Sequence, residues 1–461
     1  MKKIKLFYII AFSLVILLGV NTSVFASSSL INKEYKSINV YEKFDIKKLQ
    51  NDSSKKYNYK SSDTTVVSIN ADGIITGEKM GDSVITVSDD KGNSSELNVR
   101  VGYYKGIDVS TFNGDVDYNG IKAQGIDFVM IRSSYGWYDQ YDAAAGKAYN
   151  FQYDAKLYNN VRGAVENNVP FGIYHYSYAR NTSEAVMEAE YTINALKSTG
   201  AYAKSMSLPI AYDVEDSKYQ GSIDKETLTD IVIAYCKKIR EAGYQPMIYA
   251  NKNWFVNHLN INRLNSLGYD FWYALWPGGN IDFSNKIQIA NSGIYPLIWQ
   301  YTSSGSVNGA NTNSGRVDLN VMYMKDQVKL TFVSDGLVVE ERGIDKNTST
   351  NFPEVSKKGY SFLKWVDDNG NIQTEQTKFN SNTTITAVYE FNDYIRGDIT
   401  RDGKVDMEDV YTAVKRLARG TLSDEDKLII EVTNDGRVDM EDIYKMLKYI
   451  AGKITVLWQN T

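Results

Sequence analysis

The sequence predicts a multidomain protein built around an irregular, TIM-like (β/α) barrel, with small all-β modules on either side and an α-helical unit near the C-terminus. Three patterns indicate this organisation. Apolar strand-like runs and helical patterns alternate over residues 104–325, short runs of alternating apolar and polar residues fill 33–102 and 328–391, and a ten-residue motif recurs within 394–455. A chain of 461 residues is long enough for three or so domains of ordinary size.

The composition limits the chemistry. The chain has two histidines, His175 and His258, and one cysteine, Cys236. A zinc site with several histidines or a CxxC cluster is therefore disfavoured, and no cofactor is expected for catalysis. The 56 acidic side chains outnumber the 51 basic ones, so carboxylate chemistry or oxygen-ligated calcium is expected and a nucleic-acid partner is not.

The first 26 residues have the pattern of a secretory signal peptide. A basic start, Met1-Lys-Lys-Ile-Lys5, precedes a mostly apolar run of about 15 residues, which is shorter than the ~20 that span a bilayer. Val24-Phe25-Ala26 suits cleavage after Ala26. We expect a secreted protein, extracellular or associated with a cell wall; an uncleaved membrane anchor is the alternative.

Eight strand-like runs and three helical patterns define the predicted barrel. The helices are expected at 155–168, 183–198 and 224–242, and the later connections are too rich in Gly and Asn for good helices. The strands are expected at 106–110, 128–134, 171–177, 208–215, 246–251, 271–276, 297–302 and 317–319.

The two flanking segments alternate with period 2 and carry turn signals, which is typical of small sheets. The run from Tyr59 to Gly77 closely resembles the bacterial Ig-like domain of group 2, so 33–102 is expected to form an antiparallel β-sandwich. Lys358-Gly-Tyr-Ser-Phe-Leu-Lys-Trp365 resembles the β-grasp-like Listeria-Bacteroides repeat, which would span 328–391. Both resemblances imply spacers or surface adhesives.

Acidic residues gather at the ends of the predicted barrel strands. Asp108 ends the first strand, Asp213 and Glu215 end the fourth, and Asp318 lies on the eighth. Because the C-terminal ends of barrel strands meet at one mouth, we expect these four carboxyls to lie together. Asp213 and Glu215 are two apart on a strand, so they face the same way and one pKa should rise. Carboxyls with separated pKa values suit glycoside hydrolysis, which needs a protonated acid and an anion.

Aromatic and polar side chains occupy the same strand ends, where aromatic planes could stack on sugar rings. The candidate sugar contacts are Tyr174, Tyr176, Tyr249, Trp272, Tyr273 and Gln300. Each feature has another interpretation, because aspartates also cap turns and aromatics also pack cores. Their combination at matching strand ends favours a site.

Several segments in this order resemble glycoside hydrolase family 25, the lysozymes (N-acetylmuramidases), over nearly all of 104–325. The resemblance implies Glu215 as the general acid/base and Asp213 as the group that orients the substrate or stabilises the developing cation. It leaves open whether an aspartate or the substrate acetamide is the nucleophile. The matching segments are Lys105-Gly-Ile-Asp-Val-Ser110, Phe171-Gly-Ile-Tyr-His-Tyr176, Ile210-Ala-Tyr-Asp-Val-Glu215, Ile298-Trp-Gln-Tyr301 and Val317-Asp-Leu-Asn320.

The same resemblance assigns supporting roles. Asp108 and Asp318 complete an acidic floor, and His175 is expected to be a structural hydrogen-bonding residue rather than a base. The sugar subsites would be lined by Tyr174, Tyr249, Trp272 and Gln300.

The repeated motif places oxygen ligands at the spacing of an EF-hand-type calcium loop. Asp402-Gly-Lys-Val-Asp-Met-Glu-Asp-Val-Tyr411 recurs as Asp435-Gly-Arg-Val-Asp-Met-Glu-Asp-Ile-Tyr444, with glycine at the sharp-turn position of each loop. Up to two calcium ions are expected, with a backbone carbonyl from Lys404 or Arg437. The remaining candidate ligands are Asp398, Thr400, Asp402, Asp406 and Asp409 in the first loop, and Glu431, Thr433, Asp435, Asp439 and Asp442 in the second.

Two such loop–helix units resemble a type I dockerin over 394–455, which implies a cohesin domain on another secreted protein as partner. Thr400 and Thr433 replace the usual asparagine and Glu431 replaces aspartate, so the second loop is expected to bind calcium more weakly. The dipeptides that begin at Met407 and Met440 occupy the recognition positions and are nearly symmetric, which would allow two binding orientations. A calcium-stabilised tail without a partner is the alternative.

Together these patterns predict a secreted peptidoglycan hydrolase that cleaves the β-1,4 bond between N-acetylmuramic acid and N-acetylglucosamine and attaches to a cohesin-bearing partner. One alternative is a non-catalytic cell-wall-binding or adhesion protein. Another is a chitinase-like endo-N-acetylglucosaminidase of family 18, whose signature needs an acid where Ala211 stands.

Overall fold

The computed structural model describes residues 29–138, 149–357, 360–391 and 395–457, so the predicted signal peptide at 1–26 lies outside the described residues. The chain divides into two compact units, one ending at Met324 and the other beginning at Lys325. Within the described ranges, no helix is long and apolar enough to cross a membrane.

The first seven strands form two small sheets over a shared apolar core. One sheet has the order β1-β7-β6-β3 and the other β2-β5-β4. The edge strand β1 runs parallel to β7, so this part is not purely antiparallel as expected. Alternating burial along β6 follows from its period-2 pattern, which sends Ile85 and Val87 into the core. The strands are β1 (Tyr35–Ile38), β2 (Lys43–Asp45), β3 (Asn58–Ser61), β4 (Val67–Ile69), β5 (Ile74–Gly77), β6 (Gly81–Ser88) and β7 (Ser94–Val101).

A closed eight-stranded barrel follows, as the sequence predicted. The sheet runs β9-β11-β12-β13-β14-β15-β16-β8, and a β8–β9 pairing closes it, while β10 (Tyr149–Tyr153) extends β9 on the outside. The barrel strands are β8 (Tyr103–Val109), β9 (Phe128–Tyr138), β11 (Phe171–Tyr176), β12 (Ile210–Asp213), β13 (Pro246–Asn251), β14 (Asp270–Ala274), β15 (Ile298–Gly305) and β16 (Val317–Tyr323).

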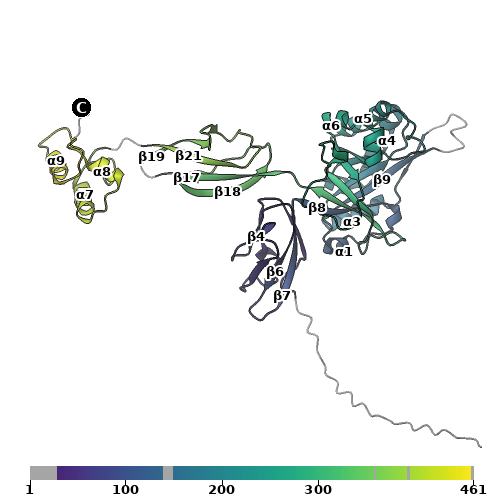
Figure 1. Cartoon of the computed structure of the whole chain (residues 1–461), viewed down its shortest axis with the longest axis horizontal. Helices are drawn as coiled ribbons and strands as arrows, with labels where there is room; N and C mark the ends of the chain where they lie inside the picture. The colour runs from purple at the N-terminus through teal and green to yellow at the C-terminus, as the bar shows by residue number, and fades with distance from the viewer. Residues whose placement is uncertain (1–28, 139–148, 358–359, 392–394, 458–461) are drawn as a thin grey trace, which may run out of the picture. The chain divides into compact units, whose positions relative to one another are not determined.

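Helices cover the outside of the barrel mainly in its first half, again as expected (Figure 1). α5 shows why one of them forms: Asp224 caps its start by accepting from the Thr227 N–H, and Leu228, Ile231 and Tyr235 form a buried stripe. The helices are α1 (Tyr118–Ala123), α3 (Leu157–Glu166), α4 (Thr182–Ser198), α5 (Lys225–Glu241) and α6 (Ile261–Ser266).

The direction of the last strand differs from the prediction. β8, β9 and β11 to β15 are parallel neighbours, but β16 runs antiparallel to both β15 and β8. Asp318 therefore lies near the start of its strand and not at a C-terminal end. Because the strand is reversed, its start meets the C-terminal ends of the others, and Asp318 pairs in register with Asp108.

Alternation along the strands separates two cores. On β8, Ile107 and Val109 pack outward against the helices, while Gly106 and Asp108 face the barrel interior. A side chain at Gly106 would clash with the ring of Phe128, whose carbons lie 2.4 Å from where a Cβ would stand. The small residue thus lets an aromatic ring fill the barrel below the acidic end.

The second unit contains a sheet of order β18-β17-β21-β19-β20 and a small helical domain. The helical core is built by Val410, Ala413, Ile429, Ile443 and Met446. The elements are β17 (Gln327–Ser334), β18 (Leu337–Asp345), β19 (Tyr360–Asp367), β20 (Ile372–Gln373), β21 (Thr383–Phe391), α7 (Met407–Arg419), α8 (Asp424–Ile430) and α9 (Met440–Ile450).

Candidate functional site

The structure brings the four predicted carboxyls together at one mouth of the barrel. Asp108 is the penultimate residue of β8, Asp213 ends β12, Glu215 follows two residues later, and Asp318 of β16 pairs in register with Asp108. Asp108 and Asp213 are buried, with 8% and 5% of their surface exposed, whereas Glu215 and Asp318 are half-buried. The four acids influence one another electrostatically.

Hydrogen bonds fix the carboxylate of Asp108 at the centre of this group. Its Oδ2 accepts from Asn320 Nδ2 at 2.8 Å and from Gln300 Nε2 at 3.0 Å. Asp318 lies in register with Asp108 on the neighbouring strand, and the two carboxyls shift each other's pKa.

Burial raises the pKa of every acid in the group. It raises the pKa of Glu215 to about 7, with the charges of Asp108 and Asp216 adding to the effect. The pKa of Asp318 rises to about 8, again by burial and then by the charge of Asp108. A group with a pKa near 7 can both release and take up a proton at neutral pH, which general acid/base chemistry needs.

Asp213 is buried beside two of the other acids. Burial and then the charges of Glu215 and Asp108 hold its pKa well above the usual range, and the guanidinium of Arg132 acts in the opposite direction. Its Oδ1 is buried and accepts no hydrogen bond from a described residue. That oxygen is free to accept a hydrogen bond from a ligand.

A cleft of about 330 Å³ opens beside Asp108 and Asp318. Its walls come from the segment after β8 and from the β15–β16 connection, and they are mostly polar. The ring of Phe112 is 68% exposed at this cleft and offers an apolar plane to a ligand. The other lining side chains include Ser110, Asn113, Tyr174, Ser303, Thr312 and Arg316.

Only some of the predicted sugar contacts are placed to touch a ligand. Tyr174 lines the cleft and Tyr176 is half-buried at the end of β11. Trp272 is 1% exposed inside the barrel, and its Nε1 donates to Asn320 Oδ1 at 2.8 Å. The structure therefore places Trp272 beneath the mouth, where it supports the acids and does not reach the cleft surface.

Gln300 and Tyr249 also lie below the cleft. Gln300 is 2% exposed; its Nε2 donates to Asp108, and its Oε1 accepts from the Tyr249 hydroxyl at 3.0 Å and from Trp276 Nε1 at 3.2 Å. Gln300 was predicted to line a sugar subsite, but every one of these bonds is internal. It positions Asp108.

Tyr273 faces the outside of the barrel. Successive residues of a strand point to opposite faces, so Trp272 and Tyr273 cannot both face inward. Tyr273 is 1% exposed and its ring packs 5.9 Å from that of Phe255 in the outer core. We therefore do not retain it as a substrate contact.

Two residues of the mouth were absent from the prediction. Asn320 could have been found, because it follows Asp318 by two positions and must share its face. Arg132 could also have been found. It is a lone arginine that follows the apolar start of β9, at a position whose side chain faces the barrel interior, and this suggests a polar environment at the mouth. Arg132 Nε donates to Asp154 Oδ2 at 2.8 Å, and the Asp154 side chain is fully buried.

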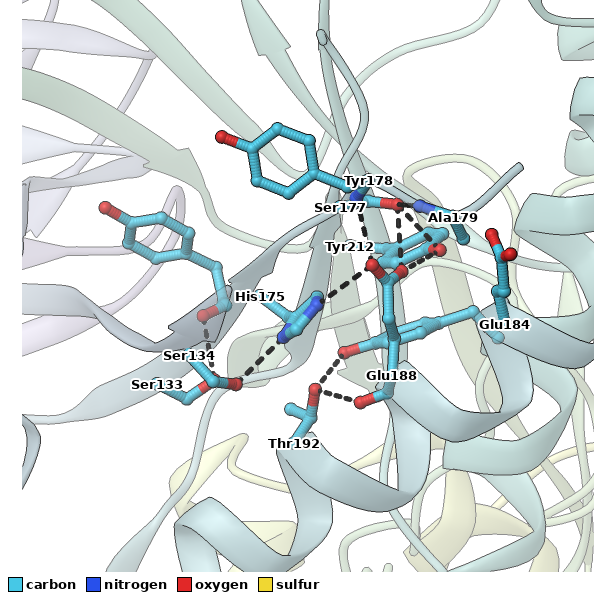
Figure 2. Close-up of polar contacts among 12 residues, drawn as sticks. Ser133, Ser134, His175, Ser177, Tyr178, Ala179, Glu184, Glu188, Thr192 and Tyr212 are labelled. Atoms are coloured by element: carbon cyan, nitrogen blue, oxygen red, sulfur yellow. Dashed lines mark hydrogen bonds and ion pairs between the residues drawn. The ribbon is translucent and has the colours of Figure 1, made fainter. Parts of the chain in front are cut away.

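A second buried polar network lies on the outer side of β11 and β12, and Figure 2 shows it. Glu188 projects from α4 toward His175 and Tyr212, which alternate with the inward-facing residues of these strands. Glu188 Oε2 accepts from the hydroxyl of Tyr212 and from Ser177 Oγ at 2.9 Å, and Oε1 accepts from the Tyr178 N–H at 2.9 Å. The network fixes the outer faces of the strands that carry Tyr174, Tyr176 and Asp213.

His175 belongs to this network and not to the mouth. Its Nδ1 lies 2.8 Å from Ser134 Oγ and its Nε2 lies 3.3 Å from Glu188 Oε1. Burial lowers the pKa of His175 to about 3 and raises the pKa of Glu188 to about 8, so neither group favours its charged form in the interior. This position supports the prediction that His175 is structural.

The two repeated loops adopt the same backbone conformation. Arg401 and Asn434 have φ of 61° and 65°, and Gly403 and Gly436 have φ of 88° and 78°. In each loop the last aspartate turns back onto the loop: Asp409 Oδ1 accepts from the Thr400 N–H at 2.8 Å, and the equivalent oxygen in the second loop accepts from Thr433 N at 3.1 Å.

The donor set of the loops fits a hard cation only in part. Asp398, Asp409 and Asp442 are buried carboxylates for which no Lys or Arg ion pair is found among the described residues. Buried carboxylates without a cationic partner favour a bound cation. However, no group of three or more His, Cys, Asp or Glu side chains in the described ranges is arranged to hold a metal, because these carboxylates face backbone N–H groups.

Two parts of the chain match known families. Residues 107–310 match the profile of Glycosyl hydrolases family 25, and residues 396–451 match that of the Dockerin type I domain. The barrel region is thus similar to family 25 glycosyl hydrolases, and the C-terminal helical region is similar to type I dockerins. The resemblances of 33–102 and 328–391 to named modules gain no support of this kind.

Curated relatives match the barrel region. An autolytic lysozyme of Clostridium acetobutylicum is 28% identical over 47% of this chain and 55% of its own length. A D-alanyl-L-alanine endopeptidase of Streptococcus phage B30 is 28% identical over 31% of each chain, and a lysozyme of Streptococcus phage Cp-1 is 25% identical over 30% of this chain and 38% of its own. The chain thus spans between about a third and just over half of these relatives.

Among solved structures, the spore cortex lytic enzyme SleM of Clostridium perfringens is similar, with 15% identity and a TM-score of 0.38 over 63% of this chain and 98% of that one. The score is too low to carry an argument.

Changing Glu188 to glutamine should remove one component of the pH dependence of stability. Folding raises the pKa of Glu188 from 4.5 to about 8, so its stabilising contribution is complete below pH 4.5 and is lost as the pH rises toward 8. Over that window the free energy of unfolding should fall by up to about 1.4 kcal/mol per pH unit more steeply in the wild type than in Glu188→Gln. Urea unfolding followed by tryptophan fluorescence measures this.

Glu190→Gln is the matched control, because Glu190 lies on the same helix but is 53% exposed and pairs with Lys238 at the surface. It should keep the wild-type slope. A Glu188→Gln protein with the wild-type slope would contradict the assignment of a protonated carboxyl at this position.

Proposed function

We propose that the protein is a secreted peptidoglycan hydrolase, a lysozyme that cleaves the β-1,4 bond between N-acetylmuramic acid and N-acetylglucosamine. The observation that carries the proposal is the group of four buried or half-buried carboxyls at the barrel mouth, in a region that matches a glycoside hydrolase family. Two of the relatives are lysozymes, which supports the substrate class.

Glu215 is the proposed general acid/base. Its pKa of about 7 leaves a large share of the enzyme with a protonated carboxyl at neutral pH, ready to protonate the glycosidic oxygen as the bond breaks. After proton transfer the same carboxylate can activate the incoming water. The half-buried position of Glu215 gives it access to substrate.

Asp213 is proposed to face the anomeric centre and the N-acetyl group. Its buried Oδ1, which has no hydrogen-bond partner among the described residues, could accept from the acetamide N–H or stabilise positive charge on the sugar ring. Arg132 favours the anionic form of Asp213, while Glu215 and Asp108 oppose it. Asp108 and Asp318 lie below, where the charge of Asp108 raises the pKa of Asp318.

The dockerin domain is proposed to bind a cohesin domain of another secreted protein. Four side chains at equivalent positions of α7 and α9 are more than half exposed: Met407, Tyr411, Met440 and Tyr444. Two similar exposed faces support two binding orientations. Calcium is proposed to bind in both loops through the ligands predicted above, where it would neutralise the buried carboxylates.

Secretion after cleavage at Ala26 is also part of the proposal, as are the roles of residues 33–102 and 328–391. These sheets are proposed to be an Ig-like module and a Listeria-Bacteroides repeat that act as spacers or surface adhesives.

Digestion of purified peptidoglycan tests the activity and Glu215 together. The wild type should release fragments with new reducing-end N-acetylmuramic acid, detected by mass spectrometry, and Glu215→Gln should be slower by about 10²- to 10⁴-fold because the proton donor is missing. Glu241→Gln, an exposed change on α5, should keep full activity.

Each other result has a distinct meaning. Equal rates for the wild type and Glu215→Gln would overturn the role of Glu215. New reducing-end N-acetylglucosamine would favour a glucosaminidase, and an absence of products from every protein would favour a non-catalytic binding module.

Calorimetry tests the dockerin. Calcium titration of the wild type should detect up to two sites, and the double change Asp402→Ala with Asp435→Ala should abolish both calcium and cohesin binding, because each substitution removes a loop ligand. Asp424→Ala is the control, since this residue is 96% exposed on α8, outside the loops. Cohesin binding that survives the double change would contradict the calcium-loop proposal.

A further inference from the structure

Arg132 is a cation placed at the acidic mouth. It stands on β9 in register with Tyr174 of β11, and its neighbours Ile131 and Ser133 are buried. The inward faces of β9 and β11 carry Met130 and Tyr174 in the inner core, so Arg132 continues the inward row of β9 toward the mouth. Its charge acts on Asp213, Tyr174 and Tyr178.

The guanidinium is held on one edge and on its faces. Nε donates to Asp154 Oδ2, and Asp154 is itself fixed by the N–H groups of Thr111 at 3.0 Å and Lys156 at 2.9 Å. The guanidinium carbon lies 5.0 Å from the centre of the Phe112 ring and 5.3 Å from that of Tyr135. A planar cation held in this way has a fixed orientation.

The other edge of the guanidinium has no partner among the described residues. Only Nε appears in a hydrogen bond, so Nη1 and Nη2 are available, and the side chain keeps 12% of its surface exposed. Phe112, which packs on Arg132, is itself a wall of the cleft. Arg132 therefore lies behind this wall, in contact with a residue that lines the cleft. A fork of two N–H groups matches the geometry of a carboxylate.

We infer that Arg132 binds a carboxylate of the substrate, either the lactyl carboxylate of muramic acid or one on its attached peptide. This inference rests on the proposed function, because it assigns a reason for choosing a muramic-acid polymer over an uncharged N-acetylglucosamine polymer. The hydrogen bond to Asp154 fixes the orientation of the Arg132 guanidinium, and the Phe112 ring packs on its face.

Binding to a catalytically silent full-length chain tests the inference separately from the activity. In the Glu215→Gln background, calorimetry measures affinity for three oligosaccharides: a chito-oligosaccharide, a peptidoglycan glycan freed of peptides, and the same glycan with its peptides. Arg132→Met should weaken binding of at least one carboxylate-bearing ligand by about 10- to 100-fold, since a charged hydrogen-bonded contact is lost. Binding of the chito-oligosaccharide should stay within about twofold.

Further variants guard against misfolding and separate the sources of the carboxylate. Arg132→Lys should restore part of the affinity. The single change Arg132→Met leaves the buried charge of Asp154 unpaired, so the double variant Arg132→Met with Asp154→Asn removes that charge as well and guards against misfolding. Arg263→Gln is a matched loss of charge on α6, where the side chain is 42% exposed and does not line the cleft, and it should leave binding unchanged. Loss only with peptides present assigns the peptide carboxylate, and loss with both glycans assigns the lactyl group.

An equal loss for all three ligands, or no loss for any, would overturn the inference. If the wild type fails to cleave peptidoglycan but the ligand-selective loss persists, the proposed hydrolysis fails while the carboxylate site stands.

Discussion

Four carboxyl groups lie at one end of the barrel with too few cations to neutralise them, and their desolvation is the constraint on which the site depends. Burial favours the uncharged form of each acid, and mutual repulsion strengthens that preference. Protons therefore remain in the group at a pH where isolated carboxyls would have lost them. Glycoside hydrolysis needs a protonated carboxyl as general acid and a second carboxyl in its anionic form.

The surrounding structure keeps this unfavourable arrangement in place. Asn320 and Gln300 hold Asp108 from below, and Tyr249, Trp272 and Trp276 in turn hold those two amides. On the outer side, Glu188 fixes β12, which carries Asp213, and the end of the neighbouring β11 through hydrogen bonds to Tyr212, Ser177 and the Tyr178 backbone. Asp108 is thus supported from inside the barrel and the strand of Asp213 from outside, which keeps the carboxyls together.

The sequence predicted the barrel well because its strands are apolar runs of strand length, separated by turn signals and amphipathic helices. Asp108, Asp213 and Glu215 were expected together because the C-terminal ends of barrel strands converge, and Asp318 joins them because its strand is reversed. The reversed direction of β16 was missed, since direction depends on pairing partners and not on local pattern. The burial of Gln300 and Trp272 and the outward face of Tyr273 depend on strand register and packing, which residue types alone do not specify.

The claim at the centre of this account is that Glu215 keeps its proton at neutral pH. The direct measurement is a ¹³C NMR titration of the glutamate side-chain carboxyls in the full chain, with the Glu215 signal assigned by its absence in Glu215→Gln. The account predicts a pKa of about 7 for that signal, because burial and nearby negative charge disfavour the carboxylate. A pKa close to 4.5 would contradict it and would leave the barrel mouth without its proton donor.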